Sequence, residues 1–284
     1  MTATFDVLAR RFPAKRAFIT GASSGLGLEL ARALGREGWK LGLFDRNVER
    51  LAHVEGELSG NGFPVLAYPG DVTNADELTV AVNSFAATHD GLDVMVNNAG
   101  VAGSGTLMEV PLEDWRWIVD INFMGVVHGA RAAIPHLQRN GSGLLINVAS
   151  AAAFASAPGM ISYNATKAAV LSLSETLSGE LAASSTQVAV VMPTFFQTNL
   201  IESFRGPAEA RERATQALRD SRYLATDAAR DILLQAGEGR FYIVLPGSAR
   251  PLWRLKRWAP LFFLKRVRAL REKMRTGQAN PPQA

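Results

Sequence analysis

Short apolar runs alternate with longer segments of helical periodicity along most of the chain. Several of the runs are apolar throughout and rich in β-branched residues, as expected for strands buried on both faces of a parallel sheet. The predicted strands are 17–20, 40–44, 65–68, 94–97, 144–149, 188–192 and 241–245. The predicted helices are 26–37, 75–88, 112–138, 160–182 and 226–235. This alternation predicts a doubly wound α/β fold with a seven-stranded parallel sheet and right-handed crossovers.

Helix signals and breaks in composition set the expected boundaries. Asn74 and Thr226 are the predicted N-caps of two helices. We find no internal repeat and no linker rich in Pro, Gly or Ser, and composition changes only near Pro246. We therefore expect one domain over residues 1–248, followed by a separate tail over residues 249–284.

Composition narrows the possible classes of protein. The chain has 284 residues, 48% of them hydrophobic, which is enough for one large core. It has no cysteine, which excludes disulfides and thiolate chemistry and fits a reducing compartment. The N-terminal segment lacks the continuous apolar stretch of a secretory signal, and no window of eighteen residues is apolar and uncharged. We expect a cytoplasmic protein.

Charge is distributed unevenly. The net charge is +4, but residues 249–284 hold ten Lys or Arg and one acid, Glu272. The other 248 residues hold 20 basic and 25 acidic side chains. The body is therefore acidic, so a basic overall charge is poor support for nucleic-acid binding.

A glycine-rich turn follows the first predicted strand. It reads Thr20-Gly21-Ala22-Ser23-Ser24-Gly25-Leu26-Gly27 and opens a helix. Gly21 permits the tight turn, Gly25 lets a pyrophosphate approach the backbone, and Gly27 lets the helix pack closely. The helix N-terminus offers free N–H groups to the anion. We expect Ser23, Ser24 and Leu26 to contribute to this dinucleotide site.

The second predicted strand leads to Asp45, where an acid can accept hydrogen bonds from both hydroxyls of an adenosine ribose. The same carboxylate would repel a 2′-phosphate, which favours NAD(H). Arg46 beside it could pair with that phosphate, so NADP(H) is the alternative cofactor. The alternative interpretation is that Asp45 and Arg46 are two solvated residues of a loop with no role in cofactor binding.

Small and polar residues follow the third and fourth predicted strands. They are Asp71 and Val72, then Asn98, Ala99 and Gly100. We expect them to line the adenine and nicotinamide-ribose side of the crevice, although each group alone could be an ordinary turn.

Candidate acid–base groups lie farther along the chain. Tyr163 and Lys167 are four residues apart, which puts them on one face of a helix. A neighbouring ammonium is expected to lower the pKa of the tyrosine and make it a usable acid or base. Ser150 could hold a substrate oxygen, and Asn122 could kink its helix and hold a water that relays protons to Lys167. An exposed helix pair is the alternative for Tyr163 and Lys167.

In order and spacing, these residues resemble the short-chain dehydrogenase/reductase family in its single-domain subtype. The resemblance covers about residues 13–247 and includes Pro193. It implies a Rossmann fold, proton transfer by Tyr163 and carbonyl polarisation by Ser150. It also implies ribose binding by Lys167, a supporting role for Asn122, and nicotinamide contacts near Pro193 and Thr198. Thr194 departs from the family pattern, which has glycine there.

The resemblance also implies a substrate lid over about residues 194–225. Phe195, Phe196 and Phe204 lie in this segment, and Phe154, Met160 and Ile161 flank the catalytic positions. They suggest a pocket for a small apolar substrate that is lipid-like, steroid or aromatic. Packing of the lid on the core is the alternative. The four histidines have no metal-ligand spacing, and the mechanism needs no metal.

The tail has apolar residues at helical spacing between its basic residues. They are Phe263, Val267, Leu270 and Met274. A basic amphipathic helix of this kind, over 249–275, favours peripheral contact with the inner face of a membrane, where each Lys or Arg contributes roughly 1 kcal/mol. Packing on the body or on another subunit is equally favoured. No motif that reads a nucleic-acid groove is present, so we expect no nucleic-acid partner.

The sequence supports an NAD(P)-dependent alcohol dehydrogenase or carbonyl reductase. The alternative is a catalytically weak dinucleotide-binding scaffold or regulator that assembles through its tail. Segments 112–138 and 160–182 resemble the family's dimerisation helices, which implies a homodimer or homotetramer.

Overall fold

One parallel sheet forms the centre of the molecule. The computed structural model describes residues 6–275, with side chains described for residues 7–269 and 272. Within this range seven strands pair in the order β3-β2-β1-β4-β5-β6-β7, and every pair is parallel. They are β1 (Arg16–Thr20), β2 (Lys40–Asp45), β3 (Val65–Pro69), β4 (Val94–Asn97), β5 (Gly143–Val148), β6 (Thr186–Pro193) and β7 (Tyr242–Leu245). The predicted seven-stranded parallel fold is confirmed.

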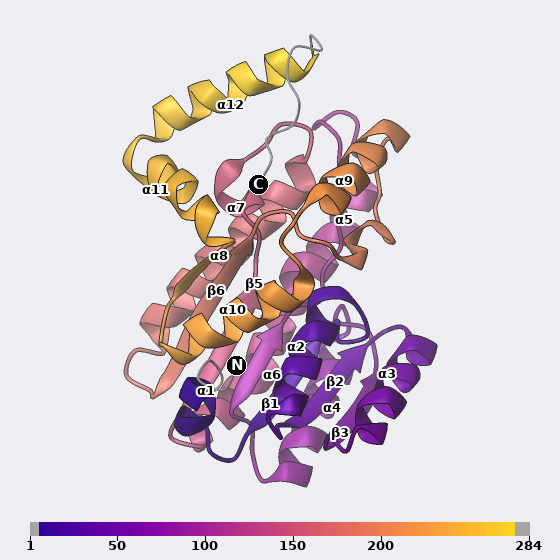
Figure 1. The fold of residues 1–284 in the computed structure, drawn as a ribbon, viewed down its shortest axis with the longest axis vertical. Coiled ribbons are helices and arrows are strands. Elements are labelled where there is room, and N and C mark those ends of the chain that lie inside the picture. Colours follow the sequence, from indigo (N-terminus) through magenta and orange to yellow (C-terminus); the bar gives the residue numbers. More distant parts are fainter. Residues whose placement is uncertain (1–5, 276–284) are drawn as a thin grey trace.

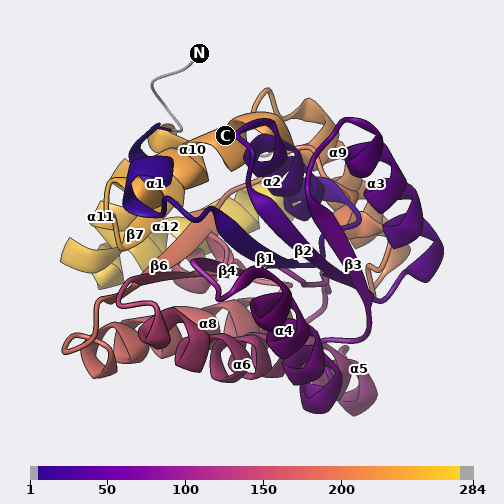
Figure 2. The ribbon, with the colours of Figure 1, turned by 90° about the horizontal axis from the view of Figure 1, so that it is seen from below.

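Helices cover both faces of the sheet, as Figure 2 shows. One layer contains α1 (Asp6–Arg11), α2 (Gly25–Arg36), α3 (Val48–Gly60) and α10 (Ala225–Gly237). The other contains α4 (Ala75–His89), α5 (Leu112–Val119), α6 (Gly125–Arg139) and α8 (Ile161–Glu180). Shorter or peripheral helices are α7 (Ala152–Ala155), α9 (Ala208–Asp220), α11 (Arg250–Trp258) and α12 (Pro260–Arg275).

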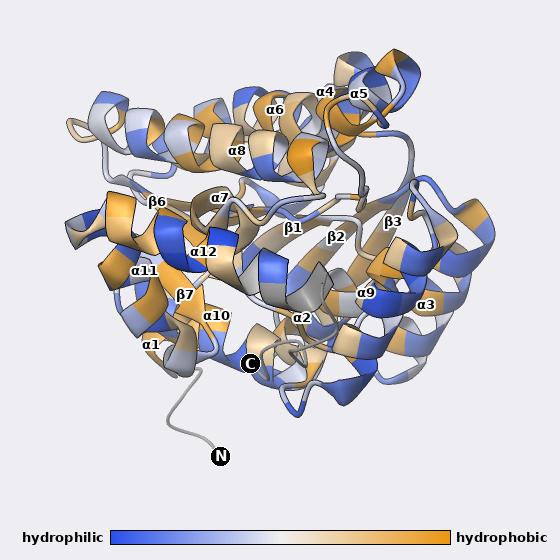
Figure 3. Ribbon diagram, turned by 90° about the horizontal axis from the view of Figure 1, so that it is seen from above, coloured by the Kyte–Doolittle hydropathy of each residue, from blue (hydrophilic) through white to orange (hydrophobic). Residues whose placement is uncertain are grey.

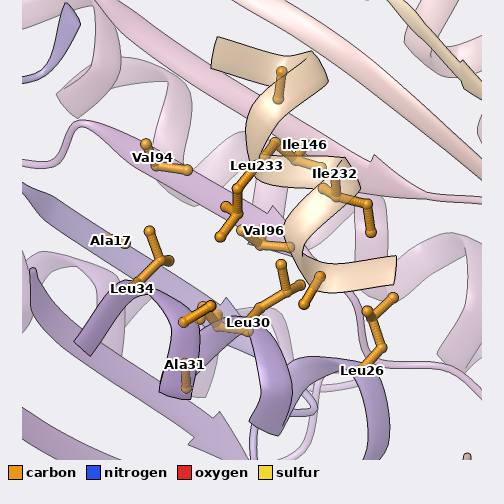
Figure 4. Close-up of a cluster of buried hydrophobic side chains, with 14 of the residues drawn as sticks. Ala17, Leu26, Leu30, Ala31, Leu34, Val94, Val96, Ile146, Ile232 and Leu233 are labelled. Atoms are coloured by element: carbon orange, nitrogen blue, oxygen red, sulfur yellow. The ribbon is translucent and has the colours of Figure 1, made fainter. Parts of the chain in front are cut away.

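The core lies between the sheet and its helices. In the first layer, Leu30 and Leu34 of α2 meet Ile232 and Leu233 of α10 over the central strands (Figure 4). These four side chains are fully buried. Burial of the apolar stripes of α2 and α10 therefore explains the position of both helices. It also fixes where α2 begins relative to β1.

The strand order reverses between β1 and β4, which creates a crevice at the carboxyl ends of the strands. Figure 1 shows α7 and α9 at one end of the molecule, and these helices follow β5 and β6. The ends of β1, β2, β4, β5 and β6 therefore all deliver residues to the same edge.

Local features differ from the sequence predictions at several points. Helices α3 and α9 were not among the predicted elements. The prediction of Thr226 as an N-cap is wrong, because α10 begins at Ala225 after Leu224. The carboxylate of Asp227 accepts from the N–H of Leu224 at 3.4 Å and so stabilises this earlier start. Asn74 is confirmed as an N-cap, since its side chain accepts from the N–H groups of Asp76 and Glu77.

The segment predicted as one helix over 112–138 is interrupted by a π turn. Asp120–Met124 forms this turn between α5 and α6, and Asn122 lies inside it. A π turn locally widens a helix and is common at functional sites. The expected irregularity at Asn122 is therefore present.

The basic tail folds as two helices, α11 and α12, separated at Ala259. They lie at the end of the molecule that carries α7, and α12 extends across that end (Figures 1 and 3). The side chains of Leu270 and Met274, and residues 1–5 and 276–284 of the predicted ranges, lie outside the described residues. In the described part of the chain, no helix is both long and apolar enough to cross a membrane.

Candidate functional site

A cavity of about 1150 Å³ lies at the carboxyl ends of the strands. It brings together nearly all the predicted site residues. Its lining includes Gly21, Ser23, Ser24, Gly25, Leu26, Asp45, Arg46, Asp71, Val72, Asn98, Ala99, Gly100, Ser150, Tyr163, Lys167, Pro193 and Thr198. Gly27 and Asn122 are not in the lining but lie directly behind it.

The glycine turn between β1 and α2 has no room for side chains. Gly21 has φ +63°, and a Cβ there would lie 2.8 Å from the Cα of Ala99. A Cβ on Gly27 would lie 2.1 Å from the carbonyl oxygen of Gly21, so α2 packs directly against the turn. Ser24 precedes α2 and makes no capping bond with its side chain. The N–H groups of Gly21, Ala22 and Ser23 are bonded within the protein, so the first N–H groups of α2 are the ones that fit a pyrophosphate.

Asp45 joins the end of β2 to this turn. One carboxylate oxygen accepts from the N–H of Ser23 at 3.0 Å, and the other accepts from the N–H of Asn47 at 2.9 Å. Asp45 thus holds a negative charge at the place expected for an adenosine ribose. Arg46 is exposed and makes no hydrogen bond or ion pair with any described residue.

Asn98 ties the end of β4 to the glycine turn. Its side-chain amide donates to the carbonyl oxygens of Thr20 at 3.0 Å and Gly21 at 3.1 Å. Its backbone N–H donates to the hydroxyl of Thr20 at 3.0 Å. The side chain therefore shapes the turn, and the residue lines the cavity beside it.

Tyr163 and Lys167 share one face of α8, and both are buried. The ammonium of Lys167 donates to the carbonyl oxygen of Val148 at 2.9 Å and lies 5.8 Å from the centre of the Tyr163 ring. Ser150 follows β5, and its hydroxyl accepts from the N–H of Ala152 at 3.1 Å. The alternative of an exposed helix pair is excluded by this burial.

The prediction that Lys167 lowers the pKa of Tyr163 is wrong for the protein alone. Burial raises the pKa of the Tyr163 phenol above its ordinary value, and a hydrogen bond with Ser150 offsets only part of this rise. Burial also lowers the pKa of Lys167 to about 8. Removal of both groups from water disfavours their charged forms and is the main cause of both shifts.

Asn122 is fully buried and holds the backbone of Val101 from both sides. Its side-chain oxygen accepts from the N–H of Val101 at 2.8 Å, and its amide donates to the carbonyl oxygen of Val101 at 2.9 Å. The amide also reaches the hydroxyl of Thr166 at 3.4 Å. The side chain of Asn122 therefore fixes the loop after β4. Because its oxygen and its amide are both bonded there, a water of the predicted proton relay would have to be held by the backbone of Asn122.

The loop after β6 closes the nicotinamide side of the predicted site. The carbonyl oxygen of Pro193 accepts from the N–H of Ala151 at 2.8 Å. Thr194, the departure from the family pattern, donates its N–H to the carbonyl oxygen of Leu245 at 2.8 Å and so extends the pairing with β7. A Cβ on Gly25 would lie 2.5 Å from the hydroxyl oxygen of Thr198, which places Thr198 against the glycine turn.

The rest of the cavity is largely apolar, and part of its wall was missed by sequence reasoning. Phe195, Phe196, Phe204 and Met160 line it, as expected for a substrate pocket. The tail contributes a further wall, which consists of Leu252, Leu255, Phe263, Arg266, Val267 and Ala269. The spacing of Phe263 and Val267 was the available signal, but it did not show which surface they would face.

No group of three or more His, Cys, Asp or Glu residues among the described residues could hold a metal ion. His128 instead bonds to the carbonyl oxygen of Val72 through a ring nitrogen, at 2.9 Å.

Comparison with known proteins gives consistent matches. A model of the short chain dehydrogenase family matches residues 15–208. An uncharacterized oxidoreductase of Staphylococcus aureus (strain USA300) is 35% identical over 190 residues, which are 67% of this chain and 81% of that protein. A 3-oxoacyl-[acyl-carrier-protein] reductase of Synechocystis is 31% identical over 224 residues, 76% of this chain and 91% of that protein.

Solved structures match over most of the chain. A short chain dehydrogenase/reductase from Burkholderia phymatum in complex with NAD is 30% identical, with a TM-score of 0.80 over 95% of this chain and 98% of that one. A 3-ketoacyl-(acyl-carrier-protein) reductase from Brucella melitensis complexed with NADH is 29% identical, with a TM-score of 0.71 over 81% of this chain and 96% of that one.

The close packing at Gly27 leads to a prediction. We expect Gly27→Ala to push α2 away from the turn, lower the thermal midpoint and weaken dinucleotide binding by about 100-fold, since the turn would lose its geometry. Gly56→Ala in α3 is the matched control, because its Cβ would meet no atom within 4 Å. It should leave binding unchanged and add up to about 1 kcal/mol of stability. Equal dinucleotide affinity in both variants would contradict the assigned role of Gly27.

Proposed function

Because the chain belongs to the short chain dehydrogenase family of oxidoreductases, we propose that it transfers a hydride between NAD(H) and a hydroxyl/carbonyl group of an apolar substrate. The observation that carries the proposal is the burial of Tyr163 and Lys167 on one face of α8, beside Ser150 and in the same cavity as the glycine turn. A module that only bound a dinucleotide would not need a buried acid–base pair.

In the proposed mechanism the bound nicotinamide supplies or accepts the hydride. The Ser150 hydroxyl donates a hydrogen bond to the substrate oxygen and orients it toward Tyr163. In reduction, the Tyr163 phenol donates its proton to that oxygen. In oxidation, the phenolate of Tyr163 accepts the proton from the substrate hydroxyl. The ammonium of Lys167, held by the carbonyl of Val148, would bind a hydroxyl of the nicotinamide ribose.

The charge at the end of β2 supports NAD(H) as the cofactor. Asp45 has its carboxylate fixed by two backbone N–H groups at the predicted ribose position, where it would repel a 2′-phosphate. The similar structures include complexes with NAD, NADH and 5-hydroxy-NADP, and they support a nicotinamide cofactor in general. NADP(H) is the second candidate because Arg46 is exposed next to Asp45.

The walls of the cavity support an apolar substrate with a chain or ring system. Phenylalanines of the lid and leucine, valine and phenylalanine of the tail all line it. The 3-oxoacyl and 3-ketoacyl reductases among the relatives make an acyl chain one member of this class. A homodimer or homotetramer assembled through α5, α6 and α8 belongs to the same proposal.

Substitution of the proposed acid–base residue is the direct test. We expect Tyr163→Phe to lower turnover by about 10²–10⁴-fold, since general acid–base catalysis contributes that much, while NADH binding stays within about twofold of wild type. Turnover is measured on a panel of apolar ketones and alcohols. Tyr68→Phe, the same change at β3 outside the cavity, should keep full activity. Undiminished turnover in Tyr163→Phe would refute the mechanism, and no wild-type turnover on any substrate would favour the scaffold alternative.

The raised pKa of Tyr163 predicts different pH profiles for the two directions. Its phenol is protonated at neutral pH, so the initial rate of reduction should be flat there and fall only as the pH passes through that raised pKa. Oxidation needs the phenolate, so its initial rate should rise with pH by up to about tenfold per unit below that pKa. Loss of the Lys167 proton above about pH 8 should weaken cofactor binding. Identical profiles in both directions would contradict these assignments.

The role of Asp45 is testable by cofactor preference. We expect wild-type protein to bind NADH more tightly than NADPH in paired fluorescence titrations. Asp45→Ala should shift the ratio of the two affinities toward NADPH by about tenfold or more, about 1.4 kcal/mol, because repulsion is removed and Arg46 remains. Asp76→Ala, an exposed acid on α4 outside the cavity, is the control and should leave the ratio unchanged. Tighter NADPH binding by the wild type would show that Arg46 outweighs Asp45.

A further inference from the structure

The junction of α11 and α12 exposes a cluster of large apolar side chains. We call residues 258–262 the elbow. Trp258 is 88% exposed, Leu261 75% and Phe262 53%. The three residues lie within five consecutive positions, so they form one patch. Isolated exposed apolar residues are ordinary, but a patch of this kind indicates a binding surface.

The elbow is not the face by which the tail packs on the body. Phe263 is only 2% exposed, and together with Val267 it lines the catalytic cavity. Phe263 and Val267, the described part of the apolar stripe that the sequence indicated, therefore point inward. The elbow carries a second set of apolar residues, which the fold of the described chain leaves uncovered.

The elbow is attached to a well-anchored helix. The Trp253 ring lies 5.0 Å from the Tyr242 ring of β7, and the Arg257 guanidinium lies 5.5 Å from the centre of each ring. Arg250 donates to the side chain of Gln235 of α10 at 2.7 Å. These contacts fix α11 on the body, so the elbow is presented at a defined place.

The charged residues that flank the elbow in sequence are all basic, and among them Arg257 pairs with Glu175 of α8 at 3.9 Å. Arg254, Lys265 and Arg268 are exposed, and none forms an ion pair with a described residue. Arg266 lies over the ring of Phe262, 5.8 Å from its centre. The sequence has no acid between residues 249 and 271. An apolar patch surrounded by unpaired cations is complementary to a surface with an apolar interior and anionic head groups.

Other occupants fit this surface less well. If the elbow met its own copy across a two-fold axis, the two sets of arginines and lysines would repel each other. A nucleic acid would satisfy the cations but would leave Leu261 and Phe262 without an apolar partner. A membrane surface satisfies both the cations and the apolar residues.

From these contacts we propose that the elbow of α11 and α12 docks on an anionic lipid surface. Trp258, Leu261 and Phe262 insert at the level of the head groups, and Arg254, Lys265 and Arg268 bind the anionic groups around them. Because the same two helices wall the catalytic cavity, docking places that cavity beside the lipid. Lipid binding does not depend on the proposed oxidoreductase chemistry and is measured without substrate.

The test is flotation of the full-length protein with vesicles. The probes are vesicles of phosphatidylcholine alone and vesicles with about 30% phosphatidylglycerol. We expect wild-type protein to float with the anionic vesicles, to float poorly with the neutral ones, and to dissociate as salt rises from about 0.1 to 0.5 M. The triple variant Trp258→Ser, Leu261→Ser, Phe262→Ser should bind at least about tenfold more weakly. The variant Arg254→Gln, Lys265→Gln, Arg268→Gln should lose its preference for anionic vesicles.

A control variant separates docking from general surface effects. Val48→Ser with Val80→Ser removes two apolar side chains that are 59% and 67% exposed, far from the tail in sequence, and it should bind vesicles like wild type. All variants should keep the wild-type thermal midpoint and NADH affinity, which shows that they fold.

Several outcomes would overturn the proposal. One is equal vesicle binding by the elbow variant and wild type, and another is no binding by wild type. A fall from oligomer to monomer in the elbow variant, by light scattering and without lipid binding in wild type, would assign the elbow to a second copy of the chain. Tight binding of a single-stranded oligonucleotide in place of vesicles would assign it to nucleic acid.

Discussion

The parallel direction of all seven strands is the constraint on which the rest of the structure depends. Because every strand ends at the same edge, the glycine turn after β1, Asp45 after β2, Asn98 after β4 and Ser150 after β5 all face one cavity. Each of these residues is separated from the next by at least one helix and one strand in sequence. The chain brings them together simply by repeating one strand–helix unit.

Within that cavity, the acid–base pair is held in a state that costs stability. The Lys167 ammonium is buried and has the carbonyl oxygen of Val148 as its hydrogen-bond acceptor. Burial disfavours the charged forms of both Lys167 and Tyr163, which lowers one pKa and raises the other. A pair buried in this way gives up folding free energy, and its two pKa values lie farther apart than they do in water, with that of Lys167 brought to about 8.

The sequence predicted the repeated and periodic parts of the structure well. All seven strands were predicted from short apolar runs, which are largely buried except in the edge strand β3. The motif residues at the strand ends gather in one cavity. Helix α9 was missed because it is largely polar and buries little beyond Leu218. The start of α10 is set by the side chain of Asp227. The preference of Thr for N-cap positions, on which the prediction of Thr226 was based, does not reveal this contact. The direction of the Tyr163 pKa shift depends on burial, a tertiary property. The orientation of the tail likewise depends on the burial of Phe263 in the wall of the cavity.

The cavity joins two parts of the chain. The family match ends at residue 208, and it contains the glycine turn, the proposed acid–base residues and the lid phenylalanines. A further part of the wall is built from α11 and α12, beyond that match. Substitutions in these two helices would therefore reshape the cavity while the turn and the acid–base residues stay as they are, so the tail is where the cavity can vary at the least cost to the proposed chemistry.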